Sequence, residues 1–431
     1  MASYLIEGGR RLSGEVTVSG SKNATLGVVA TTVLLDGPCQ IENVPQVQDV
    51  LVLVDIIRDL GIDIYFDDEG ILHVNPCSIE TCEVHNERAR DIRASYYLYG
   101  ALLGRFQEAI SYMPGGCDFG TRPIDLHLKG FNALGADYEI RHAKIHLKAE
   151  NGLQGANIFF DQVSVGATIN LMLAAVKTPG RTVIENAARE PHIVEVANFL
   201  NLMGGRIRGA GTDVIRIDGV EKLPANLGYS IIPDQIEAGT FMIAAALTHG
   251  DITVKNLIPK HMEPLSAKLL EMGADIESGE DYLRVSLEEG KTLSAANFKT
   301  APYPGFPTDL QPQTVVLLTQ AHGVGRMHEA VWPNRFQYID ELKRMSSQIE
   351  VMDKIALVQG PTDLSGSLVK ARDLRAGAAL VLAGLVASHQ TEVYDIHVIE
   401  RGYENFIEKF QNLGASIHRS SEILTQAVRE L

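Results

Sequence analysis

The sequence predicts an α/β protein, α+β by some classification schemes, made of two domains that each contain three similar units. Three observations support this class. One motif recurs six times, each copy joins a helical pattern to a strand pattern, and a second, wholly apolar helical pattern alternates with the first. The 431 residues suffice for two to three domains, and a content of 45% apolar and 21% charged residues is typical of globular proteins.

The recurring motif places apolar residues, then Leu or Met, then Gly, before a strand pattern with a period of two. We expect each helix to end at its glycine, because glycine adopts the left-handed conformation without a steric clash. Successive copies are 68 to 74 residues apart, and the fifth has Ser346 in the glycine's place, where we expect backbone strain or a different cap. The glycines of the other copies are Gly61, Gly135, Gly204, Gly273 and Gly414.

A second helical pattern, apolar on every face, alternates with the first. A helix without a polar face must be buried. The longest apolar run, residues 376–387, is too short to cross a bilayer and fits such a buried helix. The sequence therefore predicts sheets that face water on one side, with helices packed inside them. The six copies begin at Asn23, Arg93, Val165, Glu237, Leu310 and Arg375.

The composition excludes several classes of protein. A formal net charge of −16 is unsuited to a nucleic-acid partner, which requires a basic surface. The cysteines Cys39, Cys77, Cys82 and Cys117 form no CxxC pair, and the sequence has no HExxH motif, so neither a disulfide scaffold nor a metal site is expected. The N-terminal residues contain no signal-peptide core. We expect a cytoplasmic protein without membrane insertion, and the sequence leaves its oligomeric state open.

Three cations stand where buried helices are expected to begin, namely Lys22, Arg93 and Arg375. A helix N-terminus already carries unsatisfied N–H groups and a partial positive charge, so a cation there is locally unfavourable. An anion held between the cation and the helix start would explain the placement. The alternative is a solvated terminal charge, which is less favoured because the placement recurs in related units.

The segment over residues 114–129 combines glycines, an isolated thiol and a cation. Cys117 lies between Gly116 and Gly120, and Arg122 follows. Thr-Arg follows Gly120 where a phosphate-binding loop would have Lys-Ser or Lys-Thr, so that motif is rejected. Arg122 could lower the pKa of the thiol and make it reactive, whereas the alternative is a small apolar cysteine.

Asp309 lies in a segment that four prolines stiffen, over residues 302–312. A rigidly held carboxylate suits a general base, for which geometry matters before pKa. The same residue could be the N-cap of the following helix, and the two roles are compatible.

Six motifs, spread over the whole chain, resemble the UDP-N-acetylglucosamine 1-carboxyvinyltransferase family. The resemblance implies the fold of the enolpyruvyl transferases, a two-domain inside-out α/β barrel built from six units. It implies one domain over residues 22–232 and a discontinuous one over residues 1–21 and 233–431. The motifs are VSGSKNATL (18–26), PGGCDFGTRPIDLH (114–127), FPTDLQPQ (306–313), VWPNRF (331–336), DLRAG (373–377) and ERGYE (400–404).

The resemblance also implies a reaction, in which the enolpyruvyl group of phosphoenolpyruvate is transferred to the 3′-hydroxyl of UDP-N-acetylglucosamine (UDP-GlcNAc) and phosphate is released. This is the first committed step of peptidoglycan synthesis, on which cell wall biogenesis, cell shape and cell division depend. It proceeds by addition and elimination through a tetrahedral intermediate. The implied partners are these two small-molecule substrates, with no cofactor.

Several charged residues match the family's contacts to phosphoenolpyruvate. Lys22, Arg122 and Arg401 resemble the cations that contact the phosphate. Arg335 and Arg375 resemble those on the carboxylate side. The full matched set is Lys22, Asn23, Cys117, Arg122, Arg335, Asp373, Arg375 and Arg401.

Three further roles follow from the same resemblance. Asp373 resembles the residue that holds the arginine network, and Asp309 resembles the base that accepts the proton of the sugar hydroxyl. Cys117 resembles the loop cysteine that donates a proton, can form an adduct with phosphoenolpyruvate and is alkylated by fosfomycin. The implied catalytic residues are Cys117, Asp309, Lys22 and Arg401.

A second set of residues matches the family's contacts to the nucleotide sugar. One position departs from the pattern, because Gln162 stands where some members have a lysine that would contact the diphosphate. The matched residues are Asn23, Arg93, Arg122, Pro123, Ile124, Asp125, Leu126, Ser164, Val165, Gly166, Asp309 and Val331.

Two other functions compete with this one. 5-Enolpyruvylshikimate-3-phosphate (EPSP) synthase shares the implied fold and also uses phosphoenolpyruvate. It has no equivalent of the loop that contains Cys117. A non-catalytic paralogue that binds UDP-sugars is disfavoured because Lys22, Asp309, Arg375 and Arg401 are retained together with this cysteine.

Overall fold

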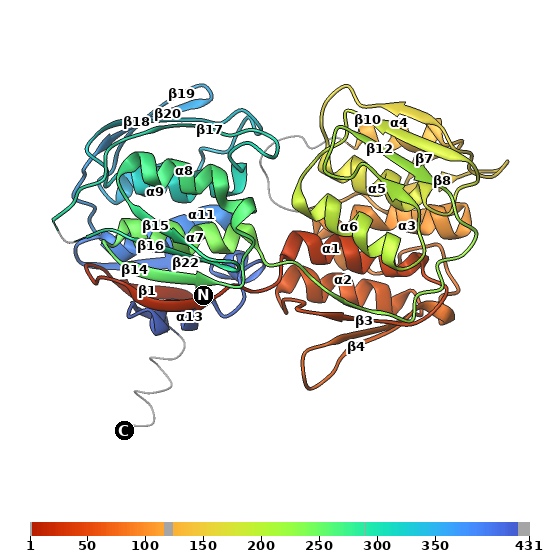
Figure 1. Ribbon diagram of the computed structural model, residues 1–431, viewed down its shortest axis with the longest axis horizontal. Coiled ribbons are helices and arrows are strands. Elements are labelled where there is room, and N and C mark those ends of the chain that lie inside the picture. Colours follow the sequence, from red (N-terminus) through yellow and green to blue (C-terminus); the bar gives the residue numbers. More distant parts are fainter. Residues whose placement is uncertain (1, 116–123, 289, 421–431) are drawn as a thin grey trace. The chain divides into compact units, whose positions relative to one another are not determined.

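The computed structural model describes residues 2–115, 124–288 and 290–420 (Figure 1). The chain divides into two compact units: the N-terminal unit, residues 20–232, and the C-terminal unit, residues 1–19 with 233–431. The chain therefore passes from one unit to the other at Ser19–Gly20 and returns at Ile232–Pro233. Both units combine helices with sheets, which confirms the mixed α/β class.

The described part of the N-terminal unit forms three sheets. Its helices are α1 (Lys22–Thr31), α2 (Gln48–Asp59), α3 (Tyr97–Phe106), α4 (Asp125–Ala133), α5 (Val165–Ala175) and α6 (Pro191–Leu202). In sheet order its strands are β13 (Gly228–Ser230), β3 (Cys39–Glu42), β5 (Leu72–Asn75) and β4 (Asp63–Phe66); β6 (Glu108–Tyr112), β8 (Lys144–Lys148) and β7 (Asp137–Arg141); and β11 (Ile207–Arg208), β12 (Val214–Asp218), β10 (Arg181–Glu185) and β9 (Asn157–Phe159).

The C-terminal unit also forms three sheets within its described residues, and the first two strands of the chain belong to it. Its helices are α7 (Gln235–Leu247), α8 (Glu263–Met272), α9 (Gln311–Leu318), α10 (Ile339–Arg344), α11 (Leu374–Val386), α12 (His397–Glu400) and α13 (Phe406–Asn412). In sheet order its strands are β21 (Leu368–Lys370), β22 (Gln390–Tyr394), β1 (Ser3–Glu7) and β23 (Ser416–Arg419); β15 (Asp275–Ser278), β16 (Tyr282–Ser286), β14 (Asp251–Lys255) and β2 (Ser13–Thr17); and β17 (Asn297–Lys299), β18 (Gly323–His328), β20 (Ile355–Gly360) and β19 (Gln348–Met352).

One pairing pattern recurs in the sheets of both units. In each four-stranded sheet, three strands pair antiparallel, and a fourth strand pairs parallel with one of them at an edge. The parallel pairs are β13 with β3, β9 with β10, β2 with β14, β17 with β18 and β21 with β22. The sheet of β6, β8 and β7 has an isolated parallel bridge between Glu83 and Ile110 at the corresponding edge. The sequence repeat thus corresponds to a repeated pattern of strand pairing.

The glycine of the repeated motif ends a helix in the left-handed conformation, as expected. The five glycines have φ values between 92° and 107°, and each follows α2, α4, α6, α8 or α13. Ser346, after α10, has a φ of 71° and is exposed. The fifth copy therefore keeps the turn and adopts a conformation that an L-residue with a side chain rarely takes.

The buried helices were predicted correctly, and several strands show the expected one-sided burial. Helices α5, α7 and α11 are buried apart from one residue at one end of each. Strand β10 alternates exposed and buried residues, and β14 alternates buried residues with partly buried ones. Figure 1 shows α7, α9 and α11 lying among the sheets of the C-terminal unit. In strands such as β10 and β14, one face is therefore more buried than the other.

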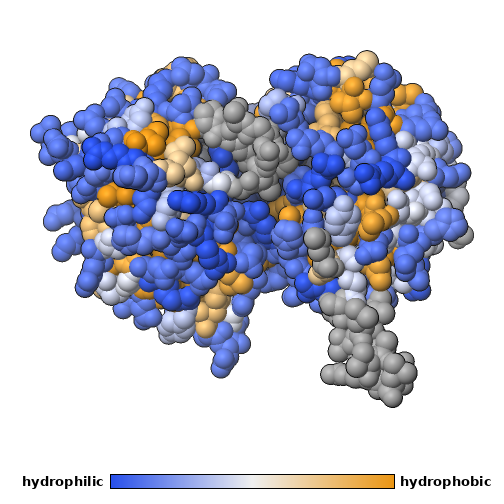
Figure 2. Space-filling view, turned by 180° about the vertical axis from the view of Figure 1, so that it is seen from behind, coloured by the Kyte–Doolittle hydropathy of each residue, from blue (hydrophilic) through white to orange (hydrophobic). Residues whose placement is uncertain are grey.

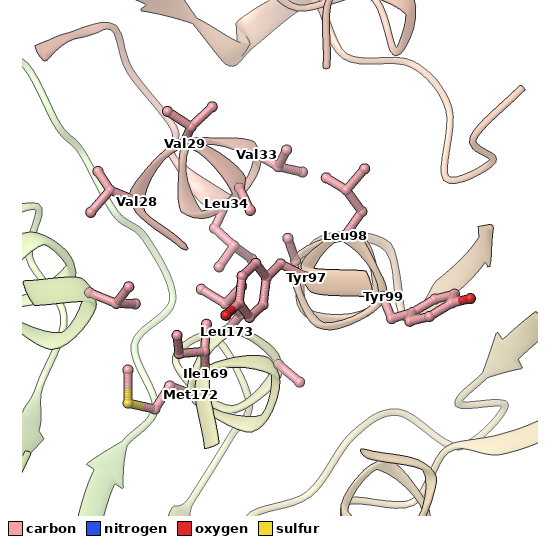
Figure 3. Close-up of a cluster of buried hydrophobic side chains, with 14 of the residues drawn as sticks. Val28, Val29, Val33, Leu34, Tyr97, Leu98, Tyr99, Ile169, Met172 and Leu173 are labelled. Atoms are coloured by element: carbon pink, nitrogen blue, oxygen red, sulfur yellow. The ribbon is translucent and has the colours of Figure 1, made fainter. Parts of the chain in front are cut away.

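Helices α1, α3 and α5 meet in the core of the N-terminal unit (Figure 3). Val28, Leu98, Ile169 and Leu173 are fully buried there. Each such side chain contributes about 1.5–3 kcal/mol relative to an exposed one. The close approach of α3 to α5 requires glycine, because a Cβ at Gly100 would lie 2.3 Å from the carbonyl oxygen of Asn170.

The surface is largely hydrophilic on the face that Figure 2 shows, with apolar residues in scattered groups. No helix within the described residues has the length and hydropathy needed to span a membrane. Among the described cysteines, Cys39 is buried, Cys77 is exposed and Cys82 is partly buried, and all three are free thiols.

Substitution of Ser346 by glycine should stabilise the protein. Relief of the left-handed strain, roughly 1–2 kcal/mol, outweighs the roughly 0.5–1 kcal/mol lost to the greater freedom of glycine in the unfolded chain. We expect Ser346→Gly to raise the free energy of unfolding in urea by about 0.5–1 kcal/mol. The matched control is Gly414→Ser, where an added Cβ meets nothing within 4 Å, so that only backbone strain should destabilise the variant. A loss of stability in Ser346→Gly would contradict the prediction.

Candidate functional site

Asp309 is held between two buried arginines in the C-terminal unit. It lies in a 3₁₀ turn, Thr308–Leu310, that leads into α9. Its Oδ1 accepts a hydrogen bond from Nη2 of Arg335 at 2.9 Å, and its Oδ2 accepts one from Nε of Arg375 at 3.2 Å. The arginine side chains are 3% exposed and that of Asp309 is 31% exposed. The carboxylate is therefore fixed in orientation while part of it remains accessible.

The alternative role of Asp309 as a helix N-cap is wrong. The N-cap residue of α9 is Leu310, that of the preceding 3₁₀ turn is Pro307, and neither makes a side-chain cap hydrogen bond. The Asp309 carboxylate is engaged by the two guanidinium groups instead.

Arg375 is positioned by the start of α11. Asp373 is the N-cap residue of this helix, and its Oδ1 accepts from the backbone N–H groups of Arg375 at 2.9 Å and Ala376 at 3.0 Å. We expected Asp373 to hold the arginine network. The structure corrects this expectation: Asp373 fixes the backbone from which Arg375 extends, and Asp309 contacts the guanidinium.

The guanidinium of Arg375 lies against Tyr403, with its Cζ 5.3 Å from the ring centroid. Burial opposes its positive charge, but interactions with Tyr403, Asp309 and Asp234 favour the charge, and the pKa of Arg375 is raised above its ordinary value. Its Nη1 and Nη2 have no hydrogen-bond acceptor among the described residues. A buried guanidinium that stays charged and retains unused donors favours the binding of an anion.

Lys22 is the first residue of α1 in the N-terminal unit, and it pairs with Asp49 in the first turn of α2. Its Nζ lies 3.3 Å from Oδ2 of Asp49, and each side chain is 11% exposed. The alternative of a solvated terminal charge is therefore wrong for Lys22. Asp49 was not identified from the sequence.

The anion expected beside the cations at helix starts is, in two cases, a carboxylate of the chain itself. Asp49 meets Lys22, and Asp309 meets Arg375. These cations therefore do not by themselves require a bound ligand. What favours an anionic ligand is that Nη1 and Nη2 of the buried Arg375 have no hydrogen-bond acceptor among the described residues.

Four residues gather where α5 begins in the N-terminal unit. The Cζ of Arg93 lies 5.4 Å from the ring centroid of Tyr96, and the rings of Tyr96 and His127 meet edge to face at 4.9 Å. A Cβ at Gly166 would lie 2.7 Å from the Tyr96 hydroxyl and 3.0 Å from Cε1 of His127, so only glycine fits. The structure thus brings Arg93 together with the starts of α4 and α5.

His127 is neutral in this group, and its hydrogen-bond partners define its tautomer. Oδ1 of Asn170 accepts from the backbone N–H of Gly100 at 2.8 Å, so the Nδ2 of Asn170 faces His127 and donates to its Nδ1 at 2.8 Å. Nδ1 therefore carries no proton, and the ring hydrogen is on Nε2. Burial, with a smaller contribution from the positive charge of Arg93, lowers the pKa of His127 to about 3.

The remaining predicted residues of the N-terminal unit lie at helix starts. Asn23 is the second residue of α1 and Val165 the first of α5, whose N-cap Ser164 accepts from the N–H of Ala167 at 3.3 Å. At the start of α4, Ile124 and Leu126 are buried and Asp125 is exposed, and Gln162 is exposed before α5. Cys117, Arg122 and Pro123 lie outside the described residues.

Two further predicted residues belong to the C-terminal unit. The N–H of Val331 donates to Oε1 of Glu329 at 2.8 Å. Arg401 follows α12, is half-buried and stands two residues before Tyr403. Within the described residues, no group of three or more His, Cys, Asp and Glu side chains is arranged as metal ligands.

Sequence reasoning missed the residues that support the predicted ones. Thr308 stands beside Asp309, and its Oγ1 accepts from Nη1 of Arg335 at 2.9 Å. Glu329 stands two residues before the VWPNRF motif and is 1% exposed. Thr308 lies within the FPTDLQPQ motif and Glu329 lies near VWPNRF, but nothing in the spacing joins residue 308 to residue 329.

Comparison with known proteins gives consistent matches over the full chain. Residues 6–410 match the family model of EPSP synthase (3-phosphoshikimate 1-carboxyvinyltransferase). The chain is 50% identical to the UDP-N-acetylglucosamine 1-carboxyvinyltransferase of Clostridium botulinum (strain ATCC 19397 / Type A), over 97% of this chain and 100% of that protein. It is 49% identical to UDP-N-acetylglucosamine 1-carboxyvinyltransferase 2 of Bacillus cereus (strain ATCC 14579), over 100% of this chain and 99% of that protein.

Solved structures give the same fold. The enolpyruvyl transferase NikO from Streptomyces tendae matches with a TM-score of 0.88 at 27% identity, covering 97% of this chain and 99% of that one. EPSP synthase from Acinetobacter baumannii matches with a TM-score of 0.75 at 18% identity, covering 97% of this chain and 100% of that one, a likeness of fold alone.

Proton uptake by His127 in the unfolded chain should lower the stability of the protein in mildly acidic solution. The pKa of His127 is about 3 in the folded protein and about 6.5 in the unfolded chain. Between these pH values the unfolded chain binds a proton at His127 and the folded protein does not. The contribution is complete above pH 6.5 and is lost as the pH falls toward 3. Between pH 7 and pH 5, wild type should lose about 2 kcal/mol more unfolding free energy than His127→Asn, which keeps an acceptor for Asn170 but does not titrate.

Urea unfolding at both pH values measures this difference. The control is His142→Asn, an exposed histidine of the same unit, which should show the same pH dependence as wild type. Equal pH dependence in wild type and His127→Asn would contradict a neutral buried His127.

Proposed function

The chain belongs to the UDP-N-acetylglucosamine 1-carboxyvinyltransferases of the enolpyruvyl transferase family, and we propose that Asp309, Arg335 and Arg375 form part of its active site. It is a transferase that moves the enolpyruvyl group of phosphoenolpyruvate to UDP-GlcNAc and releases phosphate, the first committed step of peptidoglycan synthesis. The observation that carries the site assignment is the partly exposed Asp309 carboxylate held between two buried guanidiniums.

Asp309 is the general base in this proposal. Hydrogen bonds to Arg335 and Arg375 restrict the carboxylate to one orientation, and general-base catalysis depends first on such geometry. The 3₁₀ turn that holds it lies in a segment stiffened by prolines, so its backbone is restrained as well. The proton to be accepted is that of the sugar 3′-hydroxyl.

The reaction has two stages. In the addition, the 3′-oxygen forms a bond to C2 of phosphoenolpyruvate, its proton passes to Asp309, and C3 gains a proton to become a methyl group. In the elimination, C3 returns a proton to the enzyme, the bond from C2 to the phosphate oxygen breaks and the C2–C3 double bond forms. The proton that Asp309 accepted leaves with the phosphate, which restores both groups. We assign the donation of the proton to C3 to Cys117 on the sequence motif around it.

The negative charges of phosphoenolpyruvate require cations. Arg335 and Arg375 are assigned to its carboxylate side, because bidentate guanidinium donors match a carboxylate and Arg375 retains unused donors. Lys22, Arg122 and Arg401 are assigned to the phosphate by their motifs. Asn23 completes this set, and Asp373 supports it through the backbone of Arg375.

UDP-GlcNAc is assigned to the group at the start of α5. Arg93 supplies a cation beside Tyr96, and Gly166 leaves the helix start without a side chain. The free N–H groups of such a helix start favour a diphosphate. The other assigned contacts are Asn23, residues 122–126, Ser164, Val165, Asp309 and Val331.

Family membership also supports a finer description of the fold and the location. We describe each unit as an inside-out α/β barrel, in which sheets surround helices that are buried on every face. Both substrates are phosphorylated metabolites of the cell interior, which supports a cytoplasmic enzyme.

Phosphate release in a coupled assay tests the function and separates it from both alternatives. With phosphoenolpyruvate present, UDP-GlcNAc should support release and shikimate 3-phosphate should not. Release with shikimate 3-phosphate would indicate an EPSP synthase. The sequence identities favour the nucleotide sugar, because the chain is 50% identical to a UDP-N-acetylglucosamine 1-carboxyvinyltransferase and 18% identical to a solved EPSP synthase. Binding of UDP-GlcNAc without turnover would indicate a non-catalytic paralogue.

Substitution of Asp309 by asparagine should remove the chemical step. The amide has the size of the carboxylate but cannot accept the hydroxyl proton, so we expect kcat to fall by about 10²- to 10⁴-fold. The Kd for UDP-GlcNAc, measured by calorimetry, should change by no more than a few-fold. Asp281→Asn, an exposed aspartate of the same unit, is the control and should keep wild-type turnover. Turnover near the wild-type rate in Asp309→Asn would refute the role of general base.

A further inference from the structure

Glu329 is a fully buried carboxylate that binds four hydrogen-bond donors. It is 1% exposed and follows the end of β18. Its Oε1 accepts from the hydroxyl of Thr300 at 2.8 Å and from the N–H groups of Val331 at 2.8 Å and Trp332 at 3.0 Å. Its Oε2 accepts from the hydroxyl of Thr308 at 2.9 Å. Because all four partners donate, both oxygens act as acceptors.

The hydroxyl of Thr308 links Glu329 to Arg335. Its single hydrogen is donated to Glu329, so its oxygen is left to accept from Nη1 of Arg335 at 2.9 Å. The direction of each bond is fixed, because a carboxylate can only accept and a guanidinium can only donate. Nη2 of the same arginine binds Asp309. One directed chain of hydrogen bonds therefore runs from Glu329 to Asp309.

We propose that Glu329 is a positioning residue of the active site, which orients Arg335 through Thr308 and holds the backbone at Val331. The two oxygens serve different segments: Oε2 restrains the turn that contains Asp309, and Oε1 restrains the residues after β18. The role in turnover rests on the proposed function of Asp309. Burial of a carboxylate is costly unless its acceptors are satisfied, and here all the donors come from segments around the site.

Three variants separate this role from a merely structural one. Thr308→Val removes the hydroxyl that links Glu329 to Arg335 and keeps the volume of the side chain. Glu329→Gln keeps one acceptor oxygen, but its amide N–H groups face Thr308 and the directed chain is broken. The matched control is Thr300→Val, which removes a buried hydroxyl donor to the other oxygen of the same carboxylate.

We expect Thr308→Val and Glu329→Gln to lower kcat by roughly 10- to 100-fold, as small displacements of positioned groups do. Thr300→Val should keep kcat within a few-fold of wild type although its thermal midpoint falls as much as that of Thr308→Val. The conservative variant Thr308→Ser, which retains the hydroxyl, should restore turnover to within a few-fold of wild type. Both substitutions break the same series of hydrogen bonds from Glu329 to Asp309. The double variant Thr308→Val with Glu329→Gln should therefore be no slower than the slower single variant.

Two results would overturn the inference. The first is an equal kcat in Thr308→Val and Thr300→Val, and the second is a kcat loss in Thr308→Ser as large as that in Thr308→Val. If Glu329→Gln does not fold, these threonine variants still decide the outcome. A wild-type rate in Asp309→Asn would instead refute the proposed base, so the failure of the base and the failure of the positioning role are distinguishable.

Discussion

Helices with no polar face are the constraint on which this architecture depends. A helix such as α7 or α11 can be stable in water only if other elements enclose it on all sides. Strands that alternate buried and more exposed residues, such as β14, pack against these helices, because one face of such a strand is apolar. The repeated units satisfy this requirement in the same way, with an antiparallel ladder and a parallel edge strand. The glycine-ended helices α2, α4, α6, α8 and α13 lead into the strands that follow them.

The same constraint confines polar chemistry to the ends of the buried helices. Their flanks pack against apolar side chains, so the starts of α1, α5, α9 and α11 are where charged and polar groups can reach solvent or a ligand. A cation at such a start opposes the helix dipole, and the structure balances it with a carboxylate from a neighbouring segment. The helix starts thus combine backbone donors, cations and a limited number of carboxylates.

Exposure separates the roles of two neighbouring carboxylates in the C-terminal unit. Glu329 is 1% exposed and binds four donors of the chain, so its acceptor capacity is occupied. Asp309 is bound by two guanidiniums and its side chain remains 31% exposed, so it can meet a substrate. Thr308 joins the two through its hydroxyl. The buried carboxylate restrains the turn that contains Asp309, and the accessible one fits the general base proposed above.

The sequence by itself determined the repeat, the buried helices and the helix ends, because these depend on local periodicity and on the backbone preferences of single residues. At Ser346 the sequence left two outcomes open, backbone strain or a different cap, and the structure shows the strained left-handed conformation. The sequence also pointed to Asp309, Arg335 and Arg375 through their motifs. Only the tertiary structure decided their partners: that Asp309 pairs with the arginines, that Asp373 caps a helix, that Glu329 binds Thr308, and that Asp49 pairs with Lys22. These contacts join segments that are far apart in sequence, and no local pattern encodes which side chains meet when distant segments of a unit fold around its core.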